Sequence, residues 1–254
     1  MTAISRRTLG SGPDLVLVHG WGLHSGIWGG LAPELAQHFR VILVDLPGHG
    51  LSAAVPPGDI DTCADALAAL VPQTAIWVGW SLGATLLLQL CARHRRKIDR
   101  LVLVGATPCF LRSANWSCGM EAEVFAAFAA DLRNSYRPAL QRFLTLQLGP
   151  GEESRALVRW MRTELFRHGE PDPAGLEAAL EILRRADLRD LLPQLRVPSL
   201  VIHGARDRLV PVAAAQYLAE GLGAGMQILD TAGHVPFLSH PAEFRAALGI
   251  FLHD

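Results

Sequence analysis

One serine of this sequence has surroundings that would make it reactive. Ser81 is the middle residue of Gly-Trp-Ser-Leu-Gly at 79–83, which follows a strand-like apolar run at 75–78 and precedes a helix-like run from 84. A sharp strand-to-helix turn needs these glycines, because side chains there would clash with neighbouring segments, and it holds the serine in a strained conformation. The turn also places the hydroxyl at a helix N-terminus, where free N–H groups favour developing negative charge. The pattern predicts a serine nucleophile; the simpler alternative is a turn serine without chemistry.

A serine hydroxyl is a weak nucleophile near neutral pH and needs a positioned base. Of the ten histidines, His234 lies in a loop after the last strand-like run and before the C-terminal helix. This position places it at the sheet edge where Ser81 is expected. His94 stands among arginines and His240 begins a helix, so both are expected to be surface or capping groups. We therefore predict His234 as the base.

The base in turn needs a carboxylate that fixes its tautomer. Asp207 follows the strand-like run at 200–203 and lies in a loop at the same expected edge. Asp187 and Asp190 come before that strand and would lie at its other end, and Asp230 is explained equally well as a turn residue. We predict Asp207 as the third member; an ion pair with the flanking arginines is the alternative.

An acyl-transfer site also needs two N–H donors for the oxyanion. The backbone N–H of Leu82, directly after the nucleophile, is the first candidate. The second is the N–H of Trp21, in His-Gly-Trp-Gly at 19–22, where the glycines allow close approach to an ester. Trp21 is alternatively a wall of the acyl pocket, and His19 is expected to hold this loop.

Alternating elements are expected to position these residues. Several strand-like runs are continuous and apolar, as in strands buried on both faces of a parallel sheet. The expected strands cover 15–19, 41–44, 75–78, 101–104, 200–203 and 227–229, and the expected helices 27–38, 61–71, 82–95, 212–222 and 241–252. The alternation predicts an α/β fold with a mostly parallel central sheet and helices on both faces.

A helical block interrupts the alternation between about 110 and 188. It contains only helix-like runs, at 121–132, 137–148, 154–167 and 176–185, separated in part by Gly149-Pro150-Gly151. Inserted between two strands of a parallel sheet, such a block is expected to form a lid over the strands' carboxyl ends, where ligands bind. We predict a core domain of 1–109 and 189–254 with a lid of 110–188.

Composition limits the classes of function. The 254 residues are 50% hydrophobic and 19% charged, with a formal net charge of −1, so no global field favours nucleic acid or an anionic membrane. No signal-like leader or membrane-length apolar run is evident. The scattered cysteines are therefore expected to be reduced thiols in a cytoplasmic protein, with no metal-ligand spacing, and no metal or organic cofactor is expected. They are Cys63, Cys91, Cys109 and Cys118.

These motifs together resemble the α/β-hydrolase superfamily, in which Ser, Asp and His occur in this chain order. The likeness rests on 19–22, 45–50, 79–83 and 233–234 and extends over essentially the whole chain. More specific runs resemble the pimeloyl-acyl-carrier-protein methyl ester esterases of biotin synthesis; they are 17–23, 76–83, 107–110, 142–147, 180–183 and 237–244. The resemblance implies an α/β-hydrolase fold, a cytoplasmic monomer without cofactor, and acyl-carrier protein bearing a pimeloyl methyl ester as partner.

The resemblance also implies roles for individual residues. Ser81, Asp207 and His234 would be the catalytic triad, and Trp21 and Leu82 would lie at the oxyanion positions. The substrate would contact these residues, apart from Asp207, and the lid run Phe143, Leu144, Thr145, Leu146 and Gln147. Lid arginines would hold the acidic carrier protein: Arg137, Arg142, Arg155 and Arg159. Pro138 and the 149–151 turn depart from the family's pattern, and Arg137 is displaced by one residue.

Spacing supports only part of this carrier-binding role. Arg155, Arg159 and Arg162 share one helix face, and a row of guanidiniums suits phosphate and carboxylate recognition. A solvated face paired with glutamates 152, 153 and 164 explains the pattern equally simply.

Other functions fit the same residues. A general short-chain esterase, a lactonase and a carbon–carbon bond hydrolase share this scaffold, and fold alone does not fix the substrate. A catalytically silent binding module is the alternative outside enzymes, although all three triad candidates are present.

Overall fold

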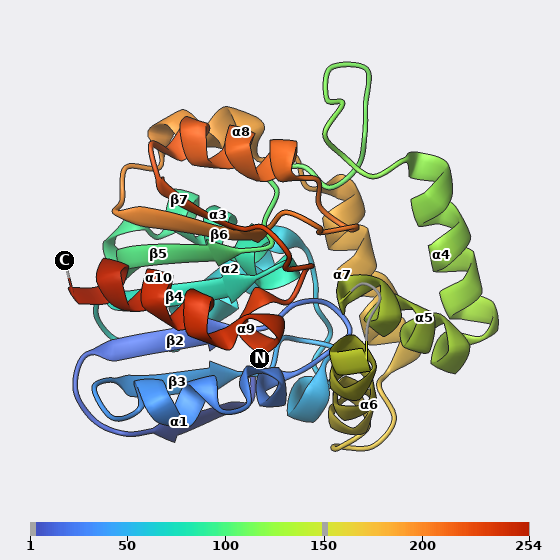
Figure 1. Cartoon of the computed structure of the whole chain (residues 1–254), viewed down its shortest axis with the longest axis horizontal. Helices are drawn as coiled ribbons and strands as arrows, with labels where there is room; N and C mark the ends of the chain where they lie inside the picture. Colours follow the sequence, from blue (N-terminus) through green and yellow to red (C-terminus); the bar gives the residue numbers. More distant parts are fainter. Residues whose placement is uncertain (1–3, 149–151, 254) are drawn as a thin grey trace.

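A seven-stranded, mostly parallel sheet forms the centre of the molecule (Figure 1). The computed structural model describes residues 4–148 and 152–253. The strand order is β1-β3-β2-β4-β5-β6-β7, and every neighbouring pair is parallel except β1 with β3. The predicted α/β class with a mostly parallel sheet is confirmed. Among the described helices, none is long and apolar enough to cross a membrane.

The inner strands are the buried apolar runs of the sequence. They are β2 Asp14–Val18, β3 Arg40–Val44, β4 Ala75–Trp80, β5 Ile98–Val104 and β6 Ser199–Gly204, and the partly exposed β7 Gly225–Leu229 lies at one edge. Every residue of β4 and β6 is buried, as expected where helices cover both faces. β1, Arg6–Leu9, was not predicted, because this edge strand is short and mostly exposed and has no apolar face.

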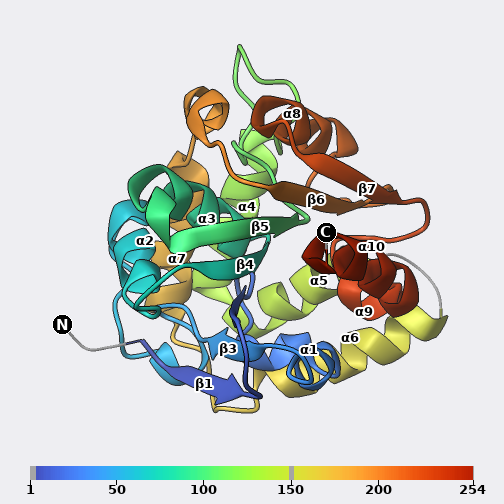
Figure 2. The same ribbon diagram turned by 90° about the vertical axis from the view of Figure 1, so that its left-hand side faces the viewer.

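Helices cover both faces of the sheet (Figure 2). α2 (Ile60–Ala68) and α3 (Leu82–Arg93) lie on one face, and α1 (Leu31–Leu35) and α10 (Pro241–His253) lie on the other. α8 (Val212–Leu222) packs beside β6 and β7, and the short α9 (Pro236–Ser239) precedes α10. The helix predicted over 27–38 was wrong as one unit. Gly29, with φ of 45°, separates a 3₁₀ turn at Ser25–Trp28 from α1.

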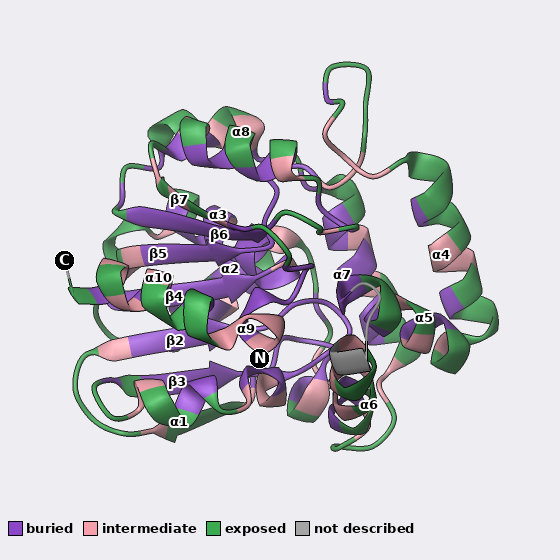
Figure 3. Ribbon diagram, viewed as in Figure 1, coloured by how far each residue is buried: buried purple, intermediate pink, exposed green. Residues whose placement is uncertain are grey.

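Among the described residues, four α-helices lie between β5 and β6 in the sequence, beside the sheet in Figure 1. They are α4 Ala122–Asn134, α5 Tyr136–Leu148, α6 Glu152–Leu165 and α7 Pro173–Arg185. Figure 3 shows that their outer surfaces are largely exposed, whereas the strands are buried. Helical segments are thus present where the sequence predicted them; the division into domains at 110 and 188 stays a prediction. The turn expected at 149–151 lies outside the described residues.

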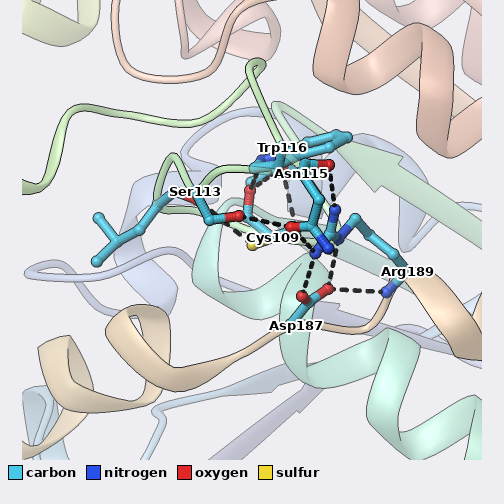
Figure 4. Close-up of polar contacts among 8 residues, drawn as sticks. Cys109, Ser113, Asn115, Trp116, Asp187 and Arg189 are labelled. Atoms are coloured by element: carbon cyan, nitrogen blue, oxygen red, sulfur yellow. Dashed lines mark hydrogen bonds and ion pairs between the residues drawn. The ribbon is translucent and has the colours of Figure 1, made fainter.

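The two chain segments that lead into and out of this helical block are tied together (Figure 4). Arg189 pairs with Asp187 at 2.5 Å and donates to the Asn115 carbonyl at 2.9 Å. Its guanidinium lies 5.3 Å from the centre of the Trp116 ring, and Trp116 Nε1 donates to the Cys109 carbonyl at 3.0 Å. We call this set of residues the clasp: Cys109, Asn115, Trp116, Asp187 and Arg189. The clasp joins the segment that precedes α4 to the segment that follows α7.

Candidate active site

Ser81 stands in a strained turn between β4 and α3. Its φ of 54° makes it the one non-glycine residue with positive φ in the described part of the chain, a conformation that costs about 1–3 kcal/mol. The backbone is held from both sides, because Ser81 N donates to the Val104 carbonyl at 2.9 Å and the Ser81 carbonyl accepts from Thr85 N at 3.1 Å. The side chain does not cap α3. The hydroxyl therefore has no capping role in α3, and the strained turn leaves it available for chemistry.

The glycines of the turn allow this geometry, as predicted. A Cβ at Gly79 would stand 2.8 Å from the Ala84 nitrogen, and one at Gly83 would collide with the carbonyl oxygens of Val18 and His19. A Cβ at Gly20 would lie 3.1 Å from that of Ser81. Backbone from two strand ends therefore closes in around the serine.

Asp207 and His234 form a buried pair. His234 Nδ1 lies 2.6 Å from Asp207 Oδ2, and the two side chains are 1% and 0% exposed. Asp207 Oδ1 accepts from the backbone N–H groups of Leu209 at 2.8 Å and Val210 at 2.9 Å. Because the carboxylate can only accept, Nδ1 of the imidazole carries the proton and Nε2 is left as the basic atom.

The environment keeps Asp207 ionised. Burial alone would raise the pKa of Asp207, but the charge and hydrogen bond of His234, together with His203 and the Val210 N–H, outweigh it. The pKa of Asp207 therefore lies below its ordinary value, and the carboxylate is charged at neutral pH.

The main chain of His234 is held from two elements. Trp80, the residue before the nucleophile, donates from Nε1 to the His234 carbonyl at 2.8 Å, and His234 N donates to the Gln147 carbonyl at 2.7 Å. The imidazole packs over Gly105, where a Cβ would stand 3.1 Å from ring atoms. These contacts bring the 234 loop next to the strand end that carries Ser81.

The structure does not join the serine and the histidine by a hydrogen bond. His234 Nε2 is buried and has no hydrogen-bond partner within the described residues. Contacts of this kind are often long in unliganded enzymes and tighten when substrate binds. The arrangement thus leaves an unpaired basic nitrogen beside the turn of Ser81, which is the state a general base needs.

His203 is a neighbour of this pair that the sequence did not reveal. It lies in β6, with Nε2 at 3.0 Å from the Val210 carbonyl and 3.6 Å from Asp207 Oδ2. Burial lowers the pKa of His203, so the ring is neutral and donates to the carbonyl. The only feature of the sequence that could have indicated this contact is the position of His203 four residues before Asp207.

The expected oxyanion donors lie on either side of the serine. Leu82 is the first residue of α3, and Trp21 follows β2 in the loop that approaches Ser81. In the part of the chain that the structure describes, neither backbone N–H donates to a protein acceptor. The Trp21 side chain is buried and donates from Nε1 to the Leu176 carbonyl at 2.8 Å, so it also fastens the loop to α7.

A small apolar cavity opens on Ser81. Ser81 is the one hydrophilic side chain in its wall apart from the Trp21 indole. The lining residues are Trp21, Ser81, Phe110, Met120, Val124, Phe125, Phe128, Phe143, Leu146, Leu180, Leu183 and Leu209. The cavity suits an uncharged chain, because a charged group would lose its hydration there without gaining a partner.

Of the lid run predicted to bind substrate, Phe143 and Leu146 line this cavity and the other three do not. Leu144 and Gln147 are buried elsewhere, and Thr145 is exposed and donates to the Gln141 carbonyl at 3.0 Å. Helical geometry accounts for Leu144 and Thr145, since residues three apart share a face and the two between them do not.

The lid arginines fall into two groups. Arg137 pairs with Glu170 and lies over the Phe166 ring, and Arg142 pairs with Asp131 at 2.5 Å. Arg155 and Arg159 are exposed on α6, together with Arg162, and within the described residues none of these three makes an ion pair.

Of the glutamates predicted to pair with the α6 arginines, only Glu164 has a described side chain. Glu164 is buried and pairs with Arg167 at 2.8 Å instead. The side chains of residues 152 and 153 lie outside the described part. Ion pairing within α6 therefore does not account for the three exposed arginines as far as the structure describes them.

Comparison with known proteins places the chain in a family. Residues 15–247 match the family described as "Alpha/beta hydrolase family". The chain belongs to this family. It is 40% identical over 245 residues to the pimeloyl-[acyl-carrier protein] methyl ester esterase of Nitrosomonas europaea, covering 96% of this chain and 97% of the relative. It is 43% identical over 242 residues to the protein of that name from Chromobacterium violaceum, covering 95% and 94%.

Solved structures of the family have the same architecture. An esterase from Exiguobacterium antarcticum has a TM-score of 0.90 at 24% identity, covering 99% of this chain and 96% of its own. An enol-lactonase from Burkholderia xenovorans has a TM-score of 0.87 at 25% identity, covering 99% and 96%. The predicted α/β-hydrolase fold and the resemblance to the methyl ester esterases are confirmed.

Proposed function

We propose that this chain is a carboxylic ester hydrolase that cleaves the methyl ester of pimeloyl-[acyl-carrier protein], releasing methanol and pimeloyl-[acyl-carrier protein] for biotin synthesis. The likeness to esterases of that name, over 94–97% of their length, carries the proposal. The site chemistry supports it independently, because an unpaired imidazole nitrogen and an apolar cavity adjoin a strained serine.

The reaction is acyl transfer in two steps. His234 Nε2 takes the proton of Ser81 as Oγ attacks the ester carbonyl, and the N–H groups of Trp21 and Leu82 stabilise the oxyanion. Asp207 stabilises the imidazolium, which then protonates the departing methanol. Water attacks the acyl-enzyme by the same route and releases the free carboxylic acid.

The cavity wall favours the substrate over the product. A methyl ester and a chain of methylenes are uncharged, so an apolar wall binds them through burial of their surface. The carboxylate formed on hydrolysis carries a charge that the wall cannot pair. The enzyme thus binds the ester and expels the acid.

The position of the cavity mouth supports the proposed carrier as a partner. Two lining residues, Val124 and Leu146, are 56% and 44% exposed, which locates the opening between α4 and α5. Arg142 is one turn before Leu146 on α5, and α6 presents Arg155 and Arg159. A negatively charged carrier protein that contacts Arg142 would lie near the mouth and direct its acyl chain toward Ser81.

A general short-chain esterase or lactonase is the second candidate. The likeness to the enol-lactonase and a cavity without charged groups favour it, since such a wall would accept other neutral esters.

The test compares the carrier-bound pimeloyl methyl ester with a free short ester such as p-nitrophenyl acetate. Mass spectrometry should detect loss of the methyl group from the carrier-bound ester, with kcat/KM at least about tenfold above that for the free ester. Equal kcat/KM for both, together with failure to rescue a biotin auxotroph that lacks the esterase, would favour the general esterase. A Ser81→Ala variant that hydrolyses both esters at the wild-type rate would refute either form.

A further inference from the structure

Helix α5 of the insertion contacts the loop that carries His234. Gln147 lies in the last turn of α5, and its carbonyl accepts the His234 N–H at 2.7 Å. Carbonyls in the last turn of a helix have no acceptor role inside the helix and need a donor from elsewhere. The 234 loop supplies that donor, so the helix end and the histidine main chain stabilise each other.

Gly233 makes this approach possible. A Cβ at 233 would stand 2.5 Å from the Gln147 oxygen, and the next contacts, at 3.4 Å, are also to residues 147 and 148 of α5. The φ of Gly233 is not in the left-handed region, because it is not among the positive-φ glycines. A side chain is therefore excluded by the closeness of α5 and not by the conformation of the loop.

The Gln147 side chain gives a second, independent sign at the same junction. It is 0% exposed, and neither its amide nitrogen nor its amide oxygen has a hydrogen-bond partner within the described residues. An unpaired buried amide destabilises the folded state, because it has lost its hydration without gaining a partner. The end of α5 is therefore destabilised by the Gln147 side chain where the helix meets the catalytic loop. This is expected of a contact that serves function more than stability.

We propose that α5 holds the catalytic histidine in register, with Gln147 and Gly233 as positioning residues that act through the 147 carbonyl and the 234 N–H. The inference rests on the proposed role of His234 as the base. α5 also carries Phe143 and Leu146 in the cavity wall. Substrate that fills the cavity therefore packs against α5 and seats the helix end on the 234 loop, which couples occupation of the cavity to alignment of the base.

Gly233→Ala tests the coupling with a single steric change. The new methyl group must push α5 and the loop apart, and a displacement on the order of 1 Å at a base costs about a hundredfold in rate. We expect kcat for a short ester to fall about 10- to 100-fold, with the acidic limb of the pH–rate profile moved, because the contact of the ring with Asp207 changes too.

Gly225→Ala is the matched control. It places the same methyl group on β7, where the nearest atoms stand at ordinary distances of 3.6 and 3.9 Å, and it should keep kcat within about twofold. A folded Gly233→Ala variant with the wild-type kcat and pH profile would overturn the proposal.

A second measurement does not depend on turnover or on that variant. Leu144→Ala removes a buried side chain of α5, and Leu132→Ala removes one of α4; the two residues are 1% and 2% exposed. Amide hydrogen exchange of His234, followed by NMR, should speed up at least about tenfold in Leu144→Ala and much less in Leu132→Ala. Wild-type exchange at His234 in a Leu144→Ala variant whose α5 amides exchange faster would overturn the coupling. Loss of the esterase assignment would instead appear as full activity in Ser81→Ala.

Discussion

His234 Nδ1 donates to Asp207 Oδ2 across 2.6 Å, with both side chains shielded from solvent. The two residues come from loops after different strands, β7 and β6, which lie side by side in the sheet. Because the strands are parallel, both loops emerge at the same edge. The pairing therefore follows from the sheet topology as much as from the loops themselves.

Asp207→Asn should abolish most of the activity without unfolding the chain. The amide would donate to Nδ1 and so turn the imidazole to the wrong tautomer, which lowers kcat by about 10⁴ in enzymes of this kind. Steady-state kinetics on a short ester measure the loss, and circular dichroism checks the fold. Asp230→Asn, an exposed position at the end of β7, should behave as wild type. Comparable losses in both variants would argue against a special role for residue 207.

Acid should destabilise the protein through buried histidines at the junction of core and lid. Burial lowers the pKa of His19 to about 3 and that of His49 to about 4, and it also lowers the pKa of His24. Below the ordinary value near 6.5 the unfolded chain binds protons that the folded chain does not. The contribution of His19 and His49 to the free energy of unfolding should therefore be fully present above about pH 6.5 and fall by about 1 kcal/mol per pH unit for each of these two residues toward pH 4.

Urea unfolding at pH 7.5 and pH 5 measures this loss. His49→Asn should reduce the slope by about one proton, and His38→Asn, at an exposed position, should not change it. A free energy of unfolding that is constant between these pH values would contradict the account.

Charge reversal on α6 should separate carrier recognition from chemistry. Arg159→Glu should raise KM for the carrier-bound ester about three- to tenfold and weaken its salt dependence, because an exposed interfacial charge acts mainly on association. The kinetics on p-nitrophenyl acetate should not change. Arg96→Glu, exposed at the opposite end of the sheet beside β5, is the control. An equal rise in KM for both variants would remove α6 from the carrier site.

The clasp should contribute to stability in a way that lysine cannot replace. Arg189 contacts Asp187, Asn115 and the Trp116 ring at once, and Trp116 packs with Leu209 and Val210, which donate to Asp207. Arg189→Lys keeps the charge but loses the planar, two-pronged contact. We expect both Arg189→Lys and Arg189→Ala to lower the free energy of unfolding by about 1–3 kcal/mol.

Arg184→Ala is the control for the clasp. Its side chain is 48% exposed and, among the residues that the structure describes, pairs with Glu181 of the same helix alone, so the effect should stay within about 0.5 kcal/mol. A fully stable Arg189→Lys would show that charge alone accounts for the contact.

Local sequence patterns were enough to predict most of the fold. The inner strands were predictable because each contains an apolar run long enough to be buried on both faces, and Ser81 was predictable because its glycines have a steric reason that is visible in the sequence. β1 was not, since an exposed edge strand of four residues has no such run. The break at Gly29 was missed because the apolar spacing continues across it.

The contacts that hold the site together depend on tertiary structure. His203 beneath Asp207 and the Gln147 carbonyl on the His234 N–H join residues that no spacing rule connects. The second of these contacts is between main-chain atoms, so side-chain identity carries no signal except the glycine at 233.

Covalent labelling of the nucleophile tests the central claim most directly. A fluorophosphonate should add to the peptide that contains Ser81 and to no other, and the mass shift should disappear in Ser81→Ala and fall by orders of magnitude in His234→Ala. Unchanged labelling in His234→Ala, or labelling of a different residue in the wild type, would contradict the proposed convergence of Ser81, His234 and Asp207.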